Sequence, residues 1–372
     1  MKKFALALLG LVLLSACEDD DNGGNTGSDG NGSGSSSPQA YVGIEGTSPN
    51  GISSLASYNR TNQTIENNVF RKANINPMGS QLSDLLLDKD QNQIVLLLPG
   101  SNKIVFIDAN NLVIKKQIKD LMQIRKIAKV SDFLYYVSSP ELGGLYVVNA
   151  LNGNIRAEIE LDGITNPTEI SVWEDMAFIC NTGDAITKDS TVSVLRTTED
   201  TLITSLIVGH SPNSMAIDEE NNLWILCSGN FDAANPLLSG VGSLWKYNLD
   251  TMKMAIDSGF TIMPDTVKYL NDNQLRPHHL IYDDQGKNLY YISAQPSGPI
   301  VMSNRFVRPL SESPLVDDTY YSIAFDPLKS ELYGMRTPGD IEKNGFLEVF
   351  DPVGNKKVSI QIGVKPVDVV FK

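Results

Sequence analysis

The sequence repeats one phrase with a period of about 44 residues. Each copy contains a turn, an apolar strand-like run, a turn rich in Asp or Asn, and a second apolar run. The phrase is clearest at 83–98, 212–226 and 277–292, and its starts lie near residues 83, 126, 167, 212, 277, 321 and 366. A period in the forties with several short strands in each unit is typical of the blades of a β-propeller.

Seven starts predict seven blades, and the last blade is incomplete. Residues 366–371 supply only an inner strand at the C-terminal end of the sequence. The strand-like segments 41–44, 52–58 and 64–70 precede the first repeat and would complete it. Such pairing closes the ring and removes an open sheet edge. We therefore expect an all-β fold over residues 41–372, a seven-bladed β-propeller closed by pairing of N- and C-terminal strands in one blade.

The first residues have the features of a secretory signal. Met1-Lys2-Lys3 is basic, and the apolar run at 4–14 is too short to cross a bilayer as a helix. The segment Leu14-Ser15-Ala16-Cys17 resembles a bacterial lipobox, which implies a signal peptide over residues 1–16 and a lipid on Cys17. An ordinary secreted protein with a chance cysteine is the alternative. Residues 17–40 then comprise the lipidated cysteine and a disordered tether rich in Gly, Ser and Asp.

The acidic segment after the cysteine bears on location. Glu18-Asp19-Asp20-Asp21 is similar to the acidic export tag of Bacteroidetes lipoproteins, although a solvated acidic start to the tether would look the same. The resemblance implies a protein anchored by lipid in the outer membrane and facing the extracellular side. The net charge of -14 argues against nucleic acid as a partner, because that function calls for a basic surface.

Two further cysteines, Cys180 and Cys227, each end a strand-like run in neighbouring repeats. Equivalent positions of neighbouring blades lie too far apart for the short reach of a disulfide. We favour two buried free thiols over a disulfide.

Two segments carry a second resemblance. Residues 207–212 and 360–366 resemble the I-x-V-G-x-x-P entry of the YVTN, or YncE-like, propeller repeat, whereas the blades that start at 83, 126 and 321 depart from it. With the lipobox, the chain resembles surface-layer-type propeller lipoproteins of Bacteroidetes. Some of these capture vitamin B12 for a TonB-dependent outer-membrane transporter, which implies cobalamin or another corrinoid as the ligand and such a transporter as the partner.

Loop lengths indicate where a ligand would bind. The turns between first and second strands are short, whereas the connections at 181–190, 228–242 and 336–345 and the link at 257–275 are long. A rigid scaffold can vary long loops freely, so function concentrates there. We place the site on the face that these loops build, over the central channel. The candidate ligand-binding residues are Arg125, Asn166, Thr168, His210, Asn213, Phe231, His278, His279, Tyr320, Tyr321 and Arg336.

The sequence contains no pattern of an enzyme. It has neither H-E-x-x-H nor G-x-S-x-G, and no Cys/His spacing of a metal site. His278 and His279 are adjacent, so on a regular strand they would point to opposite faces and could not easily chelate one metal together. We therefore expect a non-enzymatic ligand-binding lipoprotein with no catalytic residue, cofactor or metal, while a calcium site stays open. A protein- or glycan-binding module and a lactonase-like hydrolase are the alternatives.

Overall fold

The structure, a computed structural model, describes residues 39–47, 51–161, 164–184, 188–230, 240–270, 276–304, 314–339 and 342–372. The expected signal peptide, Cys17, the tether up to residue 38 and the candidate Phe231 lie outside these ranges. Among the helices within them, none has the length and apolar character needed to cross a membrane.

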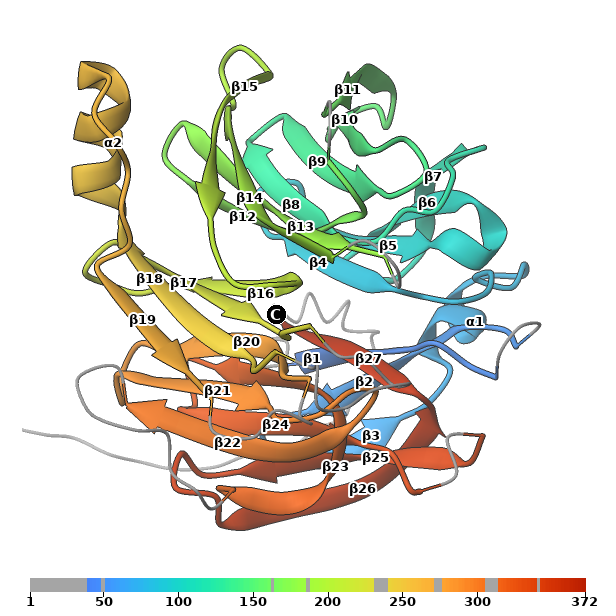
Figure 1. Ribbon diagram of the computed structural model, residues 1–372. Coiled ribbons are helices and arrows are strands. Elements are labelled where there is room, and N and C mark those ends of the chain that lie inside the picture. Colours follow the sequence, from blue (N-terminus) through green and yellow to red (C-terminus); the bar gives the residue numbers. More distant parts are fainter. Residues whose placement is uncertain are drawn as a thin grey trace, which may run out of the picture. The chain divides into compact units, whose positions relative to one another are not determined.

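Antiparallel sheets arranged around a centre form a β-propeller, which confirms the predicted all-β class (Figure 1). Four of the sheets are meanders of four consecutive strands. These are β4 (Asp84–Asp88), β5 (Gln93–Leu98), β6 (Lys103–Asp108) and β7 (Ile114–Lys119); β8 (Ile127–Ser131), β9 (Leu134–Ser139), β10 (Gly144–Asn149) and β11 (Ile155–Glu160); β12 (Pro167–Trp173), β13 (Met176–Gly183), β14 (Lys188–Arg196) and β15 (Thr201–Ile207); and β16 (Pro212–Ile217), β17 (Asn222–Cys227), β18 (Ser243–Asn248) and β19 (Thr266–Tyr269).

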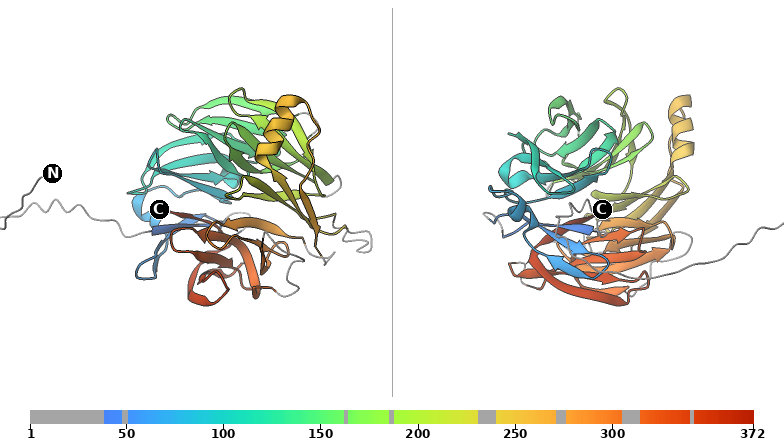
Figure 2. Two further views of the ribbon diagram at one scale, coloured as in Figure 1. Left: turned by 90° about the vertical axis from the view of Figure 1, so that its left-hand side faces the viewer. Right: turned by 180° about the vertical axis from the view of Figure 1, so that it is seen from behind.

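The two ends of the repeat array share a fifth four-stranded sheet. Its order is β27 (Pro366–Phe371), β1 (Gln39–Ile44), β2 (Ser54–Asn59) and β3 (Thr64–Glu66). Val42 pairs with Val369 in the antiparallel ladder between β1 and β27, and both views in Figure 2 show the N-terminal strands beside the C-terminus. The predicted closure is therefore confirmed. The expected strand 64–70 is shorter, because α1 (Val69–Ala73) begins there and buries Val69 and Phe70.

The expectation of seven separate sheets is not met by the hydrogen bonding. Five sheets of four strands are separate, and the remaining strands form one continuous sheet of seven within the described residues. The cause is β23, an eleven-residue strand that pairs with β22 at Val316 and Tyr320 and with β24 from Tyr320 onward. The sheet comprises β20 (His278–Asp283), β21 (Asn288–Ile292), β22 (Gly298–Asn304), β23 (Val316–Asp326), β24 (Glu331–Arg336), β25 (Asn344–Phe350) and β26 (Lys356–Val364).

A repeated aspartate explains the regular turn after the inner strand. In four repeats the Oδ1 atom of this aspartate accepts hydrogen bonds from the backbone N–H two residues later and from a second one three or four residues later. Asp and Asn favour such turns because the short side chain caps the backbone donors that the turn leaves free. The four residues are Asp88, Asp218, Asp283 and Asp326.

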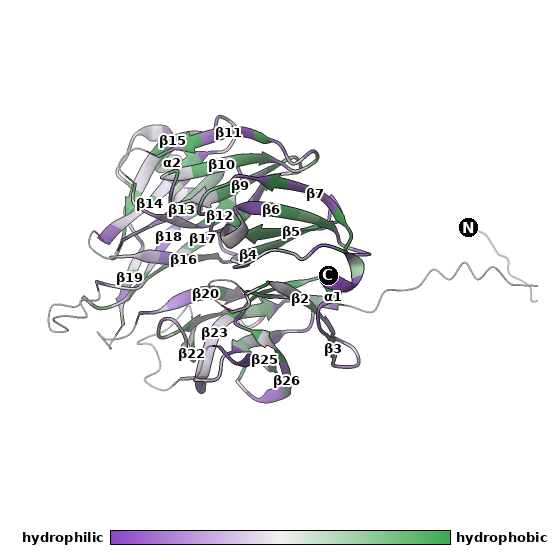
Figure 3. Cartoon of the chain, turned by 90° about the vertical axis from the view of Figure 1, so that its right-hand side faces the viewer, coloured by the Kyte–Doolittle hydropathy of each residue, from purple (hydrophilic) through white to green (hydrophobic). Residues whose placement is uncertain are grey.

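Apolar side chains fill the space between neighbouring sheets. One cluster joins Phe178 and Val194 of one sheet to Leu223 and Ile225 of the next. Figure 3 shows hydrophobic colour on β5 and hydrophilic colour on the outer strand β7. The two cysteines that the sequence predicted to be buried and free belong to this same cluster, and both are free.

One helix was not expected. Residues 257–275 were predicted to link two blades on the loop-rich face, but α2 (Leu249–Ser258) and the residues up to Asp265 lie between β18 and β19, and α2 stands at the outer side of the sheet (Figure 1). Asn248 Oδ1 accepts a hydrogen bond from Thr251 N at the start of α2, and Gly259, with φ 70°, ends it. These are ordinary helix caps. The insertion lies within the longest step between repeats, which also contains the connection at 228–242.

A buried ion pair holds the closing sheet to its neighbour. Arg60 Nη1 lies 2.5 Å from Asp326 Oδ2, and both side chains are at most 1% exposed. Arg60 Nη2 also donates to the backbone carbonyl of Lys372 at 2.7 Å. One guanidinium therefore connects the N-terminal strands, the C-terminal residue and the end of β23.

We expect Arg60→Ala to lower the free energy of unfolding by about 3–5 kcal/mol, because it leaves a buried carboxylate without its cation. Urea denaturation measures the change. Lys72→Ala is the matched control: its pair with Glu66 is 60% exposed on both sides and should contribute less than about 1 kcal/mol. Equal urea midpoints for the two variants would contradict the role of Arg60 in closure.

Candidate functional site

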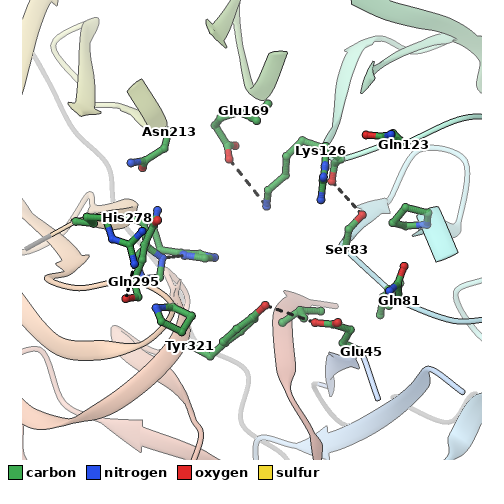
Figure 4. Close-up of a pocket in the computed structure, with 18 residues that line it drawn as sticks. Glu45, Gln81, Ser83, Gln123, Lys126, Glu169, Asn213, His278, Gln295 and Tyr321 are labelled. Carbon is green, nitrogen blue, oxygen red and sulfur yellow. Dashed lines mark hydrogen bonds and ion pairs between the residues drawn. The ribbon is translucent and has the colours of Figure 1, made fainter. Parts of the chain in front are cut away.

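A cavity of about 870 Å³ opens at the starts of the inner strands (Figure 4). Residues near the starts of β4, β8, β12, β16, β20 and β27 line it, with Tyr321 from the middle of β23 and side chains from links and second-to-third-strand loops. The cavity lies on the face where the longer loops predicted a site. We call it the mouth cavity.

Six of the candidate residues line the mouth cavity. They are Arg125, Thr168, Asn213, His278, His279 and Tyr321. Most stand at equivalent positions, one residue after the strand-starting proline or its counterpart. The shared position follows from the repeat, because each blade presents the same point of its inner strand to the centre.

The other described candidates lie outside the mouth cavity and have structural contacts. Asn166 occupies a turn with φ 57° and donates to Gly183 O. Tyr320 is fully buried and donates to Glu348, because strand neighbours face opposite sides and Tyr321 takes the channel side. Arg336 pairs with Glu348. His210 Nδ1 lies 2.8 Å from Ser190 Oγ.

The expectation that His278 and His279 point to opposite faces was wrong. The rings are in contact, with 2.5 Å between the two Nδ1 atoms, and both line the mouth cavity. His279 has φ 54°, and the pairing register of β20 with β21 shifts between His278 and Ile281. Such a bulge re-aims a side chain, so the alternation of a regular strand does not apply here.

Several mouth residues join one sheet to the next. Asn213 Nδ2 donates to Pro277 O at 2.8 Å, and Ser83 Oγ donates to Arg125 O at 3.1 Å. One residue further along β4, Asp84 Oδ2 accepts from Ile127 N at 2.9 Å. These bonds fix the polar rim in place.

Lys126 lies in a group of carboxylates at the base of the cavity. Its Nζ is 3.0 Å from Asp84 Oδ1 and 3.9 Å from Glu169 Oε2, and Figure 4 shows Lys126 and Glu169 directed toward each other. Burial opposes the charge of Lys126, but the carboxylates of Asp84, Glu169 and Asp368 outweigh it and raise the pKa of Lys126. Burial raises the pKa of Glu169 to about 7. Burial and the carboxylate of Asp84 raise the pKa of Asp368 to about 7 as well. The charge of Lys126 opposes both shifts.

The aromatic and histidine groups of the mouth stay neutral near pH 7. Burial raises the pKa of Tyr321 to about 12, and Glu45, 3.4 Å from its hydroxyl, adds to the rise. Burial lowers the pKa of His278 to about 4. Burial, together with His278 and Lys126, lowers the pKa of His279 well below its ordinary value.

The sequence did not single out several lining residues, which are Glu45, Gln81, Gln123, Lys126, Glu169, Arg276 and Gln295. Lys126 and Glu169 directly follow the candidates Arg125 and Thr168, so aligning the repeats would have found them. The others come from loops and links whose sequences do not repeat. Within the described ranges, no group of three or more His, Cys, Asp or Glu side chains is placed to hold a metal ion.

A second cavity of about 620 Å³ opens at the other ends of the inner strands. Apolar side chains such as Leu280, Phe325 and Val369 line much of it, and Asp368 reaches it from the channel. The carboxylate group around Lys126 therefore lies between a polar mouth and a more apolar opposite end.

No family model matches the chain, and no curated protein matches its sequence. Solved structures share the fold. A quinonprotein alcohol dehydrogenase-like protein from Bacteroides thetaiotaomicron has a TM-score of 0.67 at 12% identity, over 90% of this chain and 78% of that one. Kuenenia stuttgartiensis hydrazine synthase has a TM-score of 0.55 at 14% identity, over 77% and 88%. A Desulfotomaculum acetoxidans protein has 0.54 at 14%, over 73% and 80%. At these identities the likeness establishes the β-propeller fold alone.

The pKa of Glu169 yields a stability prediction. Its ordinary value is 4.5 and its folded value about 7, so the folded protein holds a proton that the unfolded chain releases. The contribution to stability is complete below pH 4.5 and is lost as the pH rises to about 7. Glu169→Gln removes this dependence, so the unfolding free energy of the variant minus that of the wild type should rise over this interval and then level off.

Urea denaturation at several pH values measures the difference. Glu158→Gln is the control, because Glu158 is exposed on β11. A Glu169→Gln difference that stays constant from pH 4.5 to 8 would show that Glu169 does not titrate in this interval.

Proposed function

We propose that this protein is a non-enzymatic lipoprotein of the outer cell surface that captures a polar small molecule in its mouth cavity. The observation that carries the proposal is the lining of that cavity. Arg125, Lys126 and Arg276 face a cavity that holds only two carboxylates among its described lining residues, Glu45 and Glu169, although the whole chain has a net charge of -14. A concave site with a few fixed polar groups is what a small ligand requires.

Fixed geometry supports binding. The bonds from Asn213 and Ser83 to the next sheet hold the rim in place, so that binding a ligand would cost little entropy for ordering these side chains. We further propose that the seven-stranded sheet works as two blades sharing β23. Tyr290 and Ile292 of one half pack against Tyr320 and Leu332 of the other as separate blades do. Seven inner strands then surround the mouth.

A corrinoid such as cobalamin is the specific ligand that we propose. It carries peripheral amides and, in cobalamin, a phosphate, which match the amide and arginine side chains of Gln81, Gln123, Gln295 and Arg125. The cavity of about 870 Å³ would admit part of such a molecule and leave the rest at the rim. The lipid on Cys17 and the tether would keep the propeller beside a TonB-dependent transporter, to which the ligand passes.

These observations give less support to the two alternative functions, a protein- or glycan-binding module and a hydrolase. A protein- or glycan-binding module calls for a flat face, whereas this face is hollowed. A hydrolase calls for carboxylates that converge on a divalent cation. Asp84, Glu169 and Asp368 do converge, but on the ammonium of Lys126.

We expect isothermal titration calorimetry to detect cobalamin binding, and Arg125→Ala to weaken it about tenfold, the loss of one charge-assisted hydrogen bond. Arg156→Ala, an exposed arginine on β11, is the control and should bind as the wild type does. No heat with cobalamin, cobinamide or other corrinoids would remove the specific proposal. Equal affinities of the two variants would move the site away from the mouth cavity.

A further inference from the structure

The two adjacent histidines form a hydrogen-bonded chain that fixes their protons. His278 Nε2 lies 2.9 Å from Ala294 O. A carbonyl only accepts, so this nitrogen carries a hydrogen, and in a neutral ring Nδ1 is then bare. The Nδ1 atom of His279, 2.5 Å away, must therefore be the donor. In a neutral His279 the lone pair is then on Nε2.

In the part of the chain that the structure describes, no group hydrogen bonds to His279 Nε2, and His279 lines the mouth cavity. Histidines that bind metals usually donate their other N–H to a neighbour, which fixes the ring and the tautomer. Here His279 donates its Nδ1–H to His278, which is 7% exposed and itself bonded to the backbone, so His278 fixes the ring and tautomer of His279.

The residues around His279 limit which metal-containing molecule can bind there. Bare zinc needs three or four protein ligands, and no group of three suitable side chains is found among the described residues. A metal bound by His279 alone must therefore arrive with its other ligands in place. We propose that His279 Nε2 coordinates an axial position of the metal in a macrocycle, a corrinoid or a haem, bound at the mouth cavity.

The inference rests on the proposed function and names one contact within it. Arg125 and Arg276 lie in the same lining and suit the phosphate or carboxylates that such macrocycles carry. With aquacobalamin, the bond from cobalt to water breaks and a bond from cobalt to Nε2 forms. Water leaves to solvent, and no electron is transferred.

Absorption spectroscopy tests the bond directly, because the visible spectrum of a corrinoid or haem reports its axial ligand. The full-length chain in detergent is titrated into aquacobalamin and, separately, into Fe(III) haem. The variants are His279→Ala and, as matched control, His210→Ala, which removes the chain's third histidine on a loop outside the cavity. Equal melting temperatures of the three proteins show that they are folded.

We expect the spectrum of one macrocycle to shift with the wild type and with His210→Ala, and not with His279→Ala. Calorimetry should then show at least a tenfold weaker complex for His279→Ala. The macrocycle that shifts identifies the ligand class. Binding by calorimetry with no spectral shift, or a shift that survives in His279→Ala, overturns this inference and leaves the capture of a small molecule standing. Absence of binding to both macrocycles overturns the inference and the corrinoid proposal together.

Discussion

Closure of the ring is the constraint on which the rest of the structure depends. A row of antiparallel sheets has two open ends, and here β27 pairs with β1 to join them. Arg60 strengthens the joint by reaching from the end of β2 to Asp326 and to the last residue. Only a closed ring brings the starts of inner strands from distant parts of the chain around one mouth. The site is therefore a product of closure, since no single blade contains it.

The polar residues of the mouth have two roles that support each other. Interior polar groups must be paired, because an unpaired one costs free energy. Asp84 and Asn213 meet this need by bonding to the backbone of the next sheet. The same bonds hold neighbouring side chains at fixed positions around a cavity. Arg125, just before β8, and His279, near the start of β20, line the cavity within this ordered rim.

The sequence predicts the propeller and its closure well, because both follow from a repeated pattern. It also predicts six of the lining residues, because equivalent positions of a repeat face the same centre. What it does not predict depends on local departures from the pattern. A bulge turns His279 toward His278, and β23 runs through two halves of one sheet. The helix α2 and the residues after it lie between β18 and β19, whereas the sequence predicted a link between two blades on the loop-rich face. Each depends on backbone geometry that side-chain alternation alone does not encode.

Charge separates the mouth from the channel beneath it. Lys126 is paired with Asp84 and lies near Glu169, so its charge is largely satisfied within the protein. An anionic group of a ligand would compete with these carboxylates for Lys126, but would not compete with them for Arg125, which lines the same cavity. An anionic group bound at Arg125 would therefore cost less free energy than one bound among the carboxylates. His279 lines the same cavity, and its Nε2 has no hydrogen-bond partner among the described residues, so the electrostatics of the channel and the tautomers of the histidines favour the same cavity for a ligand.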